Sequence, residues 1–292
     1  MQFGGFGYIF RGLFDECLDL FFIRHGFPPV GISDVNPALE SGEPPILFGR
    51  ILEPEAHFAP AMPKPARELA QLQQEVIACT RCPNLIAYCR KIAQEKRRMY
   101  RDCDYWGRPV PSFGDPRAQL LIIGLAPGAH GANRTGRMFT GDRSGEFLYR
   151  GLYEAGFANQ PTSRDGGDGL RLRNCYITAP LRCAPPQNKP RPEELSNCLP
   201  YLERELEIMT RLRAVLVLGR IAFDCYLRVA ARREGFPRRS TLVFSHGASF
   251  DLPAGLPRLF CSYHPSQQNT QTGRLTRQMF QQVLGDIRDY LG

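Results

Sequence analysis

The sequence has no apolar run as long as the roughly 18 residues of a transmembrane helix, and it has no internal repeat. Acidic residues interrupt the apolar stretch at 13–23, so we interpret that stretch as an amphipathic helix rather than a signal peptide. Acidic side chains are few, 29 against 37 Lys and Arg, which leaves a net charge of +8. We therefore expect a cytoplasmic protein, with no membrane among its partners, whose charge suits a polyanion.

Cysteine, in contrast, is abundant: the chain has ten, although disulfides are rare in the cytoplasm. Cys79 and Cys82 form a CxxC pair, and Cys183 and Cys198 form a second pair around a proline-rich loop. Four thiolates suit a zinc ion or an iron–sulfur cluster, and the spacing, which is not that of a zinc ribbon, favours the cluster. Two further cysteines compete as ligands: Cys89 and Cys103.

The chain divides into two parts by composition. Residues 1–65 are rich in proline and have no sustained apolar period, so we predict an N-terminal extension that is partly irregular. Residues 66–292 are predicted to form the functional domain, which begins with helical apolar spacing near Ala66 and continues with a second helix after Pro83.

Four short β-rich runs alternate with long helical patterns in the second part of the chain. The runs are QLLIIG (119–124), NCYITAP (174–180), AVLVLG (214–219) and LFCSY (259–263). Strands that alternate with helices indicate a parallel sheet covered on both faces. We therefore predict an α/β fold, a three-layer sandwich with a central, mostly parallel four-stranded sheet flanked by helices.

Each β-rich run leads into a loop of unusual chemistry. The loops are APGAHGAN, LRCAPPQNKPRP, Gly219-Arg220 and HPSQQNTQTGR. The first belongs to a stretch of glycines, hydroxyls and arginines that is far longer than a plain connection between elements needs. Because ligands bind beyond the carboxyl ends of parallel strands, we expect the four loops to converge on one cleft.

Three motifs in this order resemble those of the uracil-DNA glycosylase superfamily, most closely its family 5, the iron–sulfur type. GLAPGAHGANRTGRMFTGD (124–142) is similar to the first motif of the family and YHPSQQNTQTGRLT (263–276) to its second. The CxxC pair with RCAPPQNKPRPEELSNC is similar to its cluster-binding set, and the likeness covers residues 75–292. The resemblance implies a single α/β domain that excises uracil and other deaminated or damaged bases from DNA by N-glycosidic hydrolysis, leaving an abasic site. It also implies a 4Fe-4S cluster on the four paired cysteines.

A glycosylase must extrude a base from the stack and hold it in a tight pocket. Glycines such as Gly124 and Gly128 let the backbone approach the base closely, and the resemblance implies that Phe139 stacks on it. His264 is the candidate donor to the anion that develops on the leaving uracil. The expected base-binding set is Gly124, Ala126, Gly128, Phe139 and Asn174.

The chain departs from the superfamily at two positions. Ala126 stands where relatives usually have the Asp or Asn that orients water, a departure typical of family 5. We take Asn133 as the first candidate for this catalytic task and Asp142 as the alternative; an ordinary turn residue is the other interpretation of Asn133. The second strand lacks the asparagine that reads the uracil edge, and Asn174 lies five residues earlier. We therefore expect loose base selection that includes hypoxanthine or modified uracils.

DNA must also be gripped through its phosphates, for which Arg and Lys near the cleft are suited. Arg134 and Arg137 are the first candidates, and residues 90–98 carry a basic helix face that is either a DNA contact or a solvated surface. Gln267, Gln268, Asn269 and Arg274 are suited to enter the minor groove and fill the gap left by the extruded base. Further phosphate candidates are Arg143, Lys189 and Arg191. We expect a monomeric, nucleoid-associated protein that binds double- and single-stranded DNA containing uracil or other deaminated bases.

Two other functions compete with a glycosylase. A Rossmann-like nucleotide enzyme is disfavoured because GLAPGAHG has the wrong glycine spacing and no acidic residue closes the second strand. An iron–sulfur DNA-binding module without activity is disfavoured by the presence of Phe139 and His264. The pocket motifs contain no lysine that could form a Schiff base, so we predict a monofunctional enzyme.

Overall fold

The computed structural model describes residues 63–253 and 255–292. The predicted N-terminal extension, with its amphipathic helix at 13–23, lies outside these residues except for 63–65. The helices are α1 (Lys64–Ile77), α2 (Pro83–Glu95), α3 (Ala132–Thr135), α4 (Arg143–Glu154), α5 (Pro192–Ile208), α6 (Arg220–Ala230), α7 (Gln267–Gln271) and α8 (Arg277–Leu291). The strands are β1 (Phe113–Gly114), β2 (Leu120–Ile123), β3 (Cys175–Thr178), β4 (Ala214–Leu218), β5 (Ser249–Phe250) and β6 (Arg258–Ser262).

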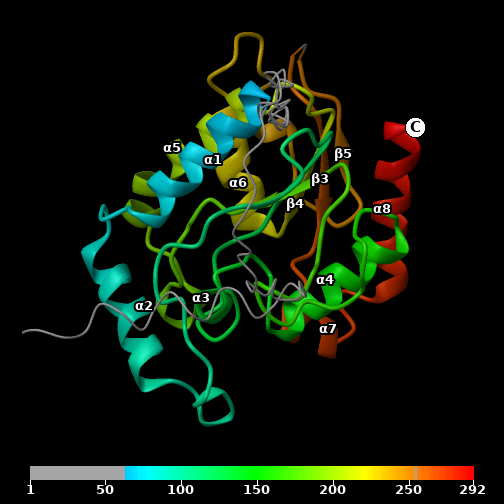
Figure 1. Cartoon of the computed structure of the whole chain (residues 1–292). Helices are drawn as coiled ribbons and strands as arrows, with labels where there is room; N and C mark the ends of the chain where they lie inside the picture. Colours follow the sequence, from blue (N-terminus) through cyan, green and yellow to red (C-terminus); the bar gives the residue numbers. More distant parts are fainter. Residues whose placement is uncertain (1–62, 254) are drawn as a thin grey trace, which may run out of the picture. The chain divides into compact units, whose positions relative to one another are not determined.

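The strands form one sheet in the order β1-β3-β2-β4-β6-β5 (Figure 1). The four inner strands pair in parallel, with Leu120 of β2 opposite Cys175 of β3 and Ala214 of β4. They are the four predicted strands, so the expected parallel core is confirmed. The two edge strands, β1 and β5, are antiparallel additions of two residues each. Runs that short carry no periodicity, which is why the sequence did not indicate them.

The sheet is covered by helices on both faces, as predicted. Alternate residues of each inner strand point to opposite sides, because strand side chains have a period of two. Leu120 and Ile122 pack in the core with α4 and α8, whereas Leu121 and Ile123 pack in the core with α1, α5 and α6. Every residue of β2, β3 and β4 is buried, which is the pattern of a parallel sheet covered on both faces.

The helix boundaries follow local capping chemistry. Pro83 begins α2 rather than bending a longer helix, since its fixed φ suits the first helical position. The Asp142 side chain caps α4 by accepting a hydrogen bond from the Gly145 N–H, and Thr276 caps α8 in the same way. Among residues 63–253 and 255–292, none of the helices has the length and apolar character needed to cross a membrane.

Candidate active site

The loops that follow the inner strands leave the sheet at the same end. The Gly124 N–H donates to the Thr178 carbonyl at the end of β3, and the Gly219 N–H donates to the Ser262 carbonyl at the end of β6. These bonds hold neighbouring strand ends in register. Residues from separate loops therefore meet beyond the carboxyl edge of the sheet, which is where ligands of open parallel sheets bind.

Phe139 and His264 face each other at this edge. Their ring centroids lie 5.8 Å apart and the ring planes are tilted by 32°. The Phe139 ring occupies the space that a side chain on Gly124 would need, since a Cβ there would lie 2.6 Å from Cε2 of the ring. Phe139 also has a φ of +52°, a strained value for a non-glycine residue, and such strain collects at functional sites. The first motif thus presents an aromatic face to the second.

The His264 imidazole is held in a neutral state. Removal from water disfavours its charged form and lowers its pKa to about 4. Its backbone carbonyl accepts a hydrogen bond from the Asn269 amide at 2.9 Å, which fixes the start of the second-motif loop. Gly219, with a φ of +95°, leaves room for the His264 Cβ. A neutral imidazole at this position can donate a hydrogen bond without first taking up a proton.

The two candidates for positioning water lie in different surroundings. Asn133 is fully buried in α3; its amide nitrogen donates to the carbonyls of Cys89 and Ala129, both at 3.3 Å. Its Oδ1 has no hydrogen-bond partner in the described part of the chain. Asp142 caps α4 and fills the space beside Gly128, and burial raises the pKa of its carboxyl group. Both side chains support the first-motif loop.

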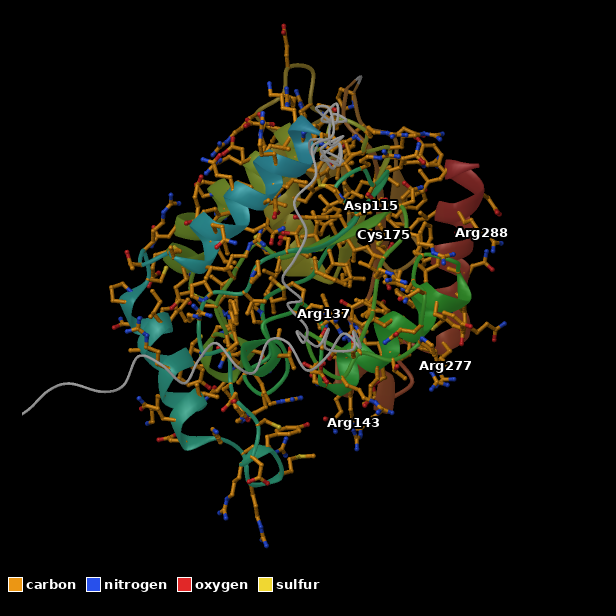
Figure 2. All side chains as sticks on the ribbon, viewed as in Figure 1. Asp115, Arg137, Arg143, Cys175, Arg277 and Arg288 are labelled. Atoms are coloured by element: carbon orange, nitrogen blue, oxygen red, sulfur yellow. The ribbon has the colours of Figure 1, made fainter. Side chains whose placement is uncertain are left out.

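Arg134 and Arg137 are buried and their guanidinium groups are engaged within the protein, so phosphate binding by these two residues stays a prediction. The Arg134 guanidinium donates to the carbonyls of His130 and Gly141, both at 2.9 Å. Arg137 forms an ion pair with Asp168 at 2.8 Å, in which both side chains are less than a tenth exposed. Both guanidinium groups form contacts that hold the loop in its shape. Arg143, in contrast, is exposed at the start of α4 and extends from the surface (Figure 2).

Asn174 lies at the wrong end of the sheet to touch a base, so its predicted role is contradicted. It directly precedes Cys175, which begins β3 beside Leu120, the first residue of β2. Its amide exchanges hydrogen bonds with Gln119, at 2.8 Å to the backbone and 2.9 Å to the side chain. In Figure 2, Cys175 and Asp115 lie away from Arg143 and the loops of the site. Asn174 therefore shapes the opposite turn.

The second-motif loop contains a short helix, α7, capped by the Ser266 hydroxyl. Gln267 and Gln268 are exposed on it, so both remain available for DNA. Asn269 is half-buried, and its amide is committed to His264 rather than to solvent. The exposed Arg274 guanidinium lies over the Tyr263 ring at 4.7 Å.

The sequence did not indicate His246, which contacts the first residue of the second motif. Its ring stacks on Tyr263 with centroids 5.2 Å apart, and its Nδ1 accepts a hydrogen bond from the Tyr263 N–H at 3.3 Å. Tyr263 directly precedes His264, so His246 fixes the backbone from which the imidazole extends. No motif or spacing in the sequence links these two residues.

The four paired cysteines line one small hollow. Cys79 follows α1, Cys82 caps α2, Cys183 follows β3, and Cys198 lies within α5. Within residues 63–253 and 255–292, no three metal-binding side chains converge on a point where they could hold a single ion. Of the competing ligands, Cys89 lies beside Cys183 and donates to the Ala184 carbonyl, whereas Cys103 lines a different hollow.

A buried polar network connects this cavity to the strand ends. Arg182 and Glu205 form an ion pair at 2.7 Å in which both side chains are almost fully buried. The Thr178 hydroxyl donates to Glu205 at 2.6 Å, and Ser112 bonds to Arg182 and Glu205. Thr178 is the last residue of β3 and lies next to Gly124. The network therefore connects the strand ends near Phe139 to the loop that carries Cys183.

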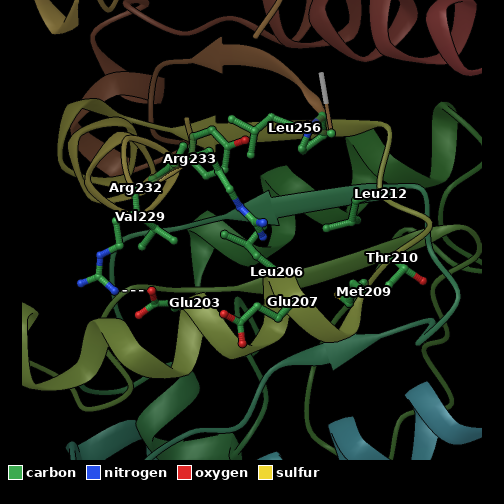
Figure 3. Close-up of a pocket in the computed structure, with 14 residues that line it drawn as sticks. Glu203, Leu206, Glu207, Met209, Thr210, Leu212, Val229, Arg232, Arg233 and Leu256 are labelled. Carbon is green, nitrogen blue, oxygen red and sulfur yellow. Dashed lines mark hydrogen bonds and ion pairs between the residues drawn. The ribbon is translucent and has the colours of Figure 1, made fainter. Parts of the chain in front are cut away.

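One groove of the described residues contains none of the predicted site residues. It lies between α5 and α6, where Arg232 and Glu203 form an ion pair (Figure 3). Its side chains combine aliphatic and charged groups with no converging set of polar atoms. The predicted residues Phe139 and His264 meet at the strand ends and not in this groove.

Comparisons with known proteins agree with this geometry. A family model described as the uracil DNA glycosylase superfamily matches residues 111–288. The type-5 uracil-DNA glycosylase of Thermus thermophilus is 50% identical over 220 residues, which make up 75% of this chain and 96% of the relative. The type-5 enzyme of Mycobacterium bovis is 46% identical over 228 residues, 78% of this chain and 83% of the relative. A type-4 uracil-DNA glycosylase of Archaeoglobus fulgidus is 35% identical over 134 residues, 43% of this chain and 59% of the relative.

Proposed function

The chain belongs to the uracil-DNA glycosylase superfamily, and we propose that it is a type-5 enzyme that excises uracil from DNA. The observation that carries the proposal is the aromatic face of Phe139 opposite a neutral His264 at the carboxyl edge of the sheet. One side chain supplies a flat apolar surface for an extruded base and the other supplies a hydrogen-bond donor. Hydrolysis of the N-glycosidic bond then leaves an abasic site.

The reaction needs stabilisation of a leaving anion. When the bond between the sugar and N1 breaks, both electrons stay with uracil, and positive charge develops on the sugar. The neutral His264 N–H is suited to bind the uracil oxygen that gains this charge, because a donor preset in a dry site costs no reorganisation. Stacking on Phe139 keeps the base plane fixed while the bond breaks. Water then adds to the sugar, and the enzyme forms no covalent intermediate.

Either of two residues could position that water. Asn133 has a buried Oδ1 without a partner, and an unpaired buried acceptor is suited to hold a water molecule. Asp142 is a carboxyl group whose pKa burial raises, which suits a base that works near neutral pH. We retain Asn133 as the first candidate. Asn133→Ala should then lower kcat more than Asp142→Asn does, and the opposite ranking in single-turnover assays would assign the task to Asp142.

The cysteine cavity fits a 4Fe-4S cluster held by Cys79, Cys82, Cys183 and Cys198. The fit rests on the chemistry of the donor set, four free thiols that line one hollow. A bound cluster would supply a structural cross-link and no step of the hydrolysis. Its ligands come from the α1–α2 turn, the loop after β3 and α5, so it would tie these three segments together. Purified protein should contain four irons per chain and absorb visible light, and Cys198→Ser should lose both properties.

Cys89 provides a control for this assignment. It is fully buried and lies beside Cys183, but it lies on the helix α2 and contacts the Ala184 carbonyl. If the four paired cysteines are the ligands, Cys89→Ser should keep its iron and its absorbance. Loss of iron from Cys89→Ser, with iron retained in Cys183→Ser, would show that Cys89 and not Cys183 is the ligand.

The DNA contacts are proposed from the side chains that remain free. Arg143, Gln267, Gln268 and Arg274 are exposed near the strand ends, whereas Arg134 and Arg137 are not. We propose a monomer that acts on uracil and other deaminated bases in double- and single-stranded DNA. The end of β3 has no amide that could read the edge of uracil, because Thr178 is followed by Ala179 and Pro180. Hypoxanthine and modified uracils are therefore proposed substrates.

A glycosylase assay tests the reaction itself. A labelled duplex with one U·G pair is incubated with the wild type or His264→Ala and then treated with alkali. Alkali-dependent cleavage by the wild type, strongly reduced in the variant, is expected. DNA binding by the wild type without cleavage would instead indicate a cluster-bearing binding module. A duplex with hypoxanthine in place of uracil tests the substrate range, and cleavage of uracil alone would refute it.

A further inference from the structure

The turn that follows α2 presents an exposed apolar side chain among cations. Met99 is 67% exposed, more than any other large apolar side chain of the described residues. No acidic residue lies between positions 96 and 101, whereas four basic residues do: Lys96, Arg97, Arg98 and Arg101. Single exposed apolar residues are common on protein surfaces. An exposed apolar side chain surrounded by basic residues is less common, and it suits a ligand that is both anionic and apolar.

The turn is held in one shape by its own contacts. Lys96 has a φ of +46°, in a region that non-glycine residues rarely adopt, and it ends α2 there. Its Nζ donates to the Arg101 carbonyl at 3.2 Å, which closes the turn around the tip. The Tyr100 N–H donates to the Arg97 carbonyl at 2.8 Å. Met99 is therefore displayed by a defined turn.

The same turn is fixed to the first-motif loop. The Arg134 guanidinium lies over the Tyr100 ring at 4.0 Å, and the Trp106 N–H donates to the Arg134 carbonyl at 2.8 Å. The Tyr105 hydroxyl bonds to Nδ1 of His130 at 3.1 Å. Burial and the positive charges of Arg97 and Arg134 lower the pKa of His130. The cations of the turn thus add to a positive region next to the pocket.

The turn also lies at the end of the molecule that carries the two motifs. It extends from the end of α2 on the same side as α3 and α7, which carry the first and second motifs (Figure 1). Many long side chains project from this end (Figure 2). A duplex whose extruded base enters the pocket must pass along this side, because its arms continue in both directions from the flipped nucleotide.

We propose that residues 96–101 are a second contact to duplex DNA, an inference that rests on the proposed glycosylase function. Arg97, Arg98 and Arg101 bind the phosphates of one arm beside the extruded base. Met99 inserts against the bases from the minor groove, as apolar wedge residues do in proteins that open base steps. The thioether is flexible and polarisable, so it adapts to any base step. The contact is independent of sequence and favours a bent duplex over a flexible single strand.

Charge reversal tests the phosphate contacts. Arg97→Glu/Arg98→Glu is compared with Arg233→Glu/Arg238→Glu. The second variant makes the same charge change on exposed residues that follow the C-terminal end of α6. Kd is measured at several salt concentrations for a duplex with a stable abasic-site analogue. The turn variant should bind about tenfold more weakly at ~0.1 M salt, with a slope of log K against log salt reduced by about 2. The control should stay within about twofold of the wild type.

Truncation tests the wedge. Met99→Ala is compared with Val243→Ala, since Val243 is 65% exposed and has no proposed role. Met99→Ala should lower kcat/KM on a uracil-containing duplex by about fivefold and leave a single-stranded uracil oligomer unaffected. Equal losses on both substrates would overturn the wedge. If the Arg97→Glu/Arg98→Glu variant melts at a lower temperature than the wild type, the Arg97→Gln/Arg98→Gln variant is measured in its place.

The outcomes separate the two proposals. An active wild type whose duplex affinity and salt slope are unchanged by both turn variants would overturn the second contact alone, and a protein partner would then be the ligand of the turn. A wild type that binds duplex DNA but does not cleave it would overturn the glycosylase, even if the turn variants weaken binding.

Discussion

The two motif loops look alike in the sequence but differ in where their polar side chains go. The first, residues 124–142, buries Arg134 and Arg137, and their guanidinium groups bind carbonyl groups and Asp168 within the protein. The second, residues 263–276, leaves Gln267, Gln268 and Arg274 in solvent. Both contain glycine, hydroxyl groups and arginine. The first loop therefore builds the pocket, and the second is free to meet the DNA.

This contrast has an energetic counterpart. A buried guanidinium is retained only if its partners compensate for lost hydration, so removing it leaves an uncompensated carboxylate behind. An exposed guanidinium contributes little to folding. Changes in the first loop should consequently be seen in stability and in catalysis, whereas changes in the second should be seen in DNA binding.

The largest effect should come from Arg137→Ala. The variant leaves Asp168 buried and unpaired, which should cost about 3–5 kcal/mol of unfolding free energy. Arg274→Ala is the matched control in the second loop and should change stability by less than about 0.5 kcal/mol. Chemical denaturation of both variants measures the difference. Equal unfolding free energies would mean that the contrast between the loops is wrong.

The same ion pair should make stability depend on pH. Burial acts to raise the pKa of Asp168, but the N–H groups of Leu170 and Arg164 and the charge of Arg137 outweigh it, so the pKa is lowered. The carboxylate therefore stabilises the fold above its unfolded pKa of about 3.9, and this stabilisation is lost as the pH falls through the lowered value. Denaturation below pH 4 should show this loss in the wild type and a smaller loss in Arg137→Ala.

His264→Ala should lower kcat by roughly 10²–10³, the usual cost of removing one donor to a developing anion. Because burial lowers the pKa of His264 to about 4, the wild type should show no step in activity near pH 6.5. Activity should fall only as the pH approaches the lowered value. Activity that is lost as the pH rises through about 6.5, with this loss absent in the variant, would show that a protonated imidazole, and not a neutral one, is the donor.

Gly124→Ala should have an intermediate effect on the first loop. The added Cβ would lie 2.6 Å from the Phe139 ring, so the ring must shift away from its position opposite His264. Overpacking of this kind costs about 1–3 kcal/mol, and kcat/KM should fall by about tenfold to a hundredfold. Gly273→Ala in the second loop is the control, because open space surrounds that position and only its φ of +72° opposes a side chain. Similar losses of kcat/KM in both variants would contradict the proposed stacking role of Phe139.

The arrangement of the loops could be predicted from the sequence because it follows from strand order. Short apolar runs separated by helices led to four parallel strands, and parallel strands bring their following loops to one edge. The meeting of Phe139 with His264 agrees with that expectation. The grouping of Cys79, Cys82, Cys183 and Cys198 does so as well. The convergence of the loops needed only the order of elements along the chain, whereas the roles given to Phe139 and to the four cysteines came from the family resemblance.

The fate of individual polar side chains could not be predicted in the same way. Arg134 and Arg137 occupy positions that suit phosphate binding, but whether a guanidinium meets DNA or a carbonyl depends on burial, which a sequence does not state. Asn174 directly precedes β3, and the strand length alone decides that it lies at the opposite edge. His246 supports Tyr263 across the edge of the sheet, a contact between segments with no shared pattern.

The smallest effect should come from Arg274→Ala, and it should be confined to DNA. Its guanidinium is exposed over Tyr263, so the variant removes one cation from the proposed DNA surface and little else. Duplex affinity should fall about threefold to fivefold, and the slope of log K against log salt should decrease by about 1. Arg137→Lys in the first loop is the opposite case: it keeps the charge but loses the Nε donor to Thr140 and the Nη2 that donates to both Asp168 oxygens, and should lower stability while leaving the salt slope unchanged. A reduced slope in Arg137→Lys, with none in Arg274→Ala, would reverse the roles given to the two loops.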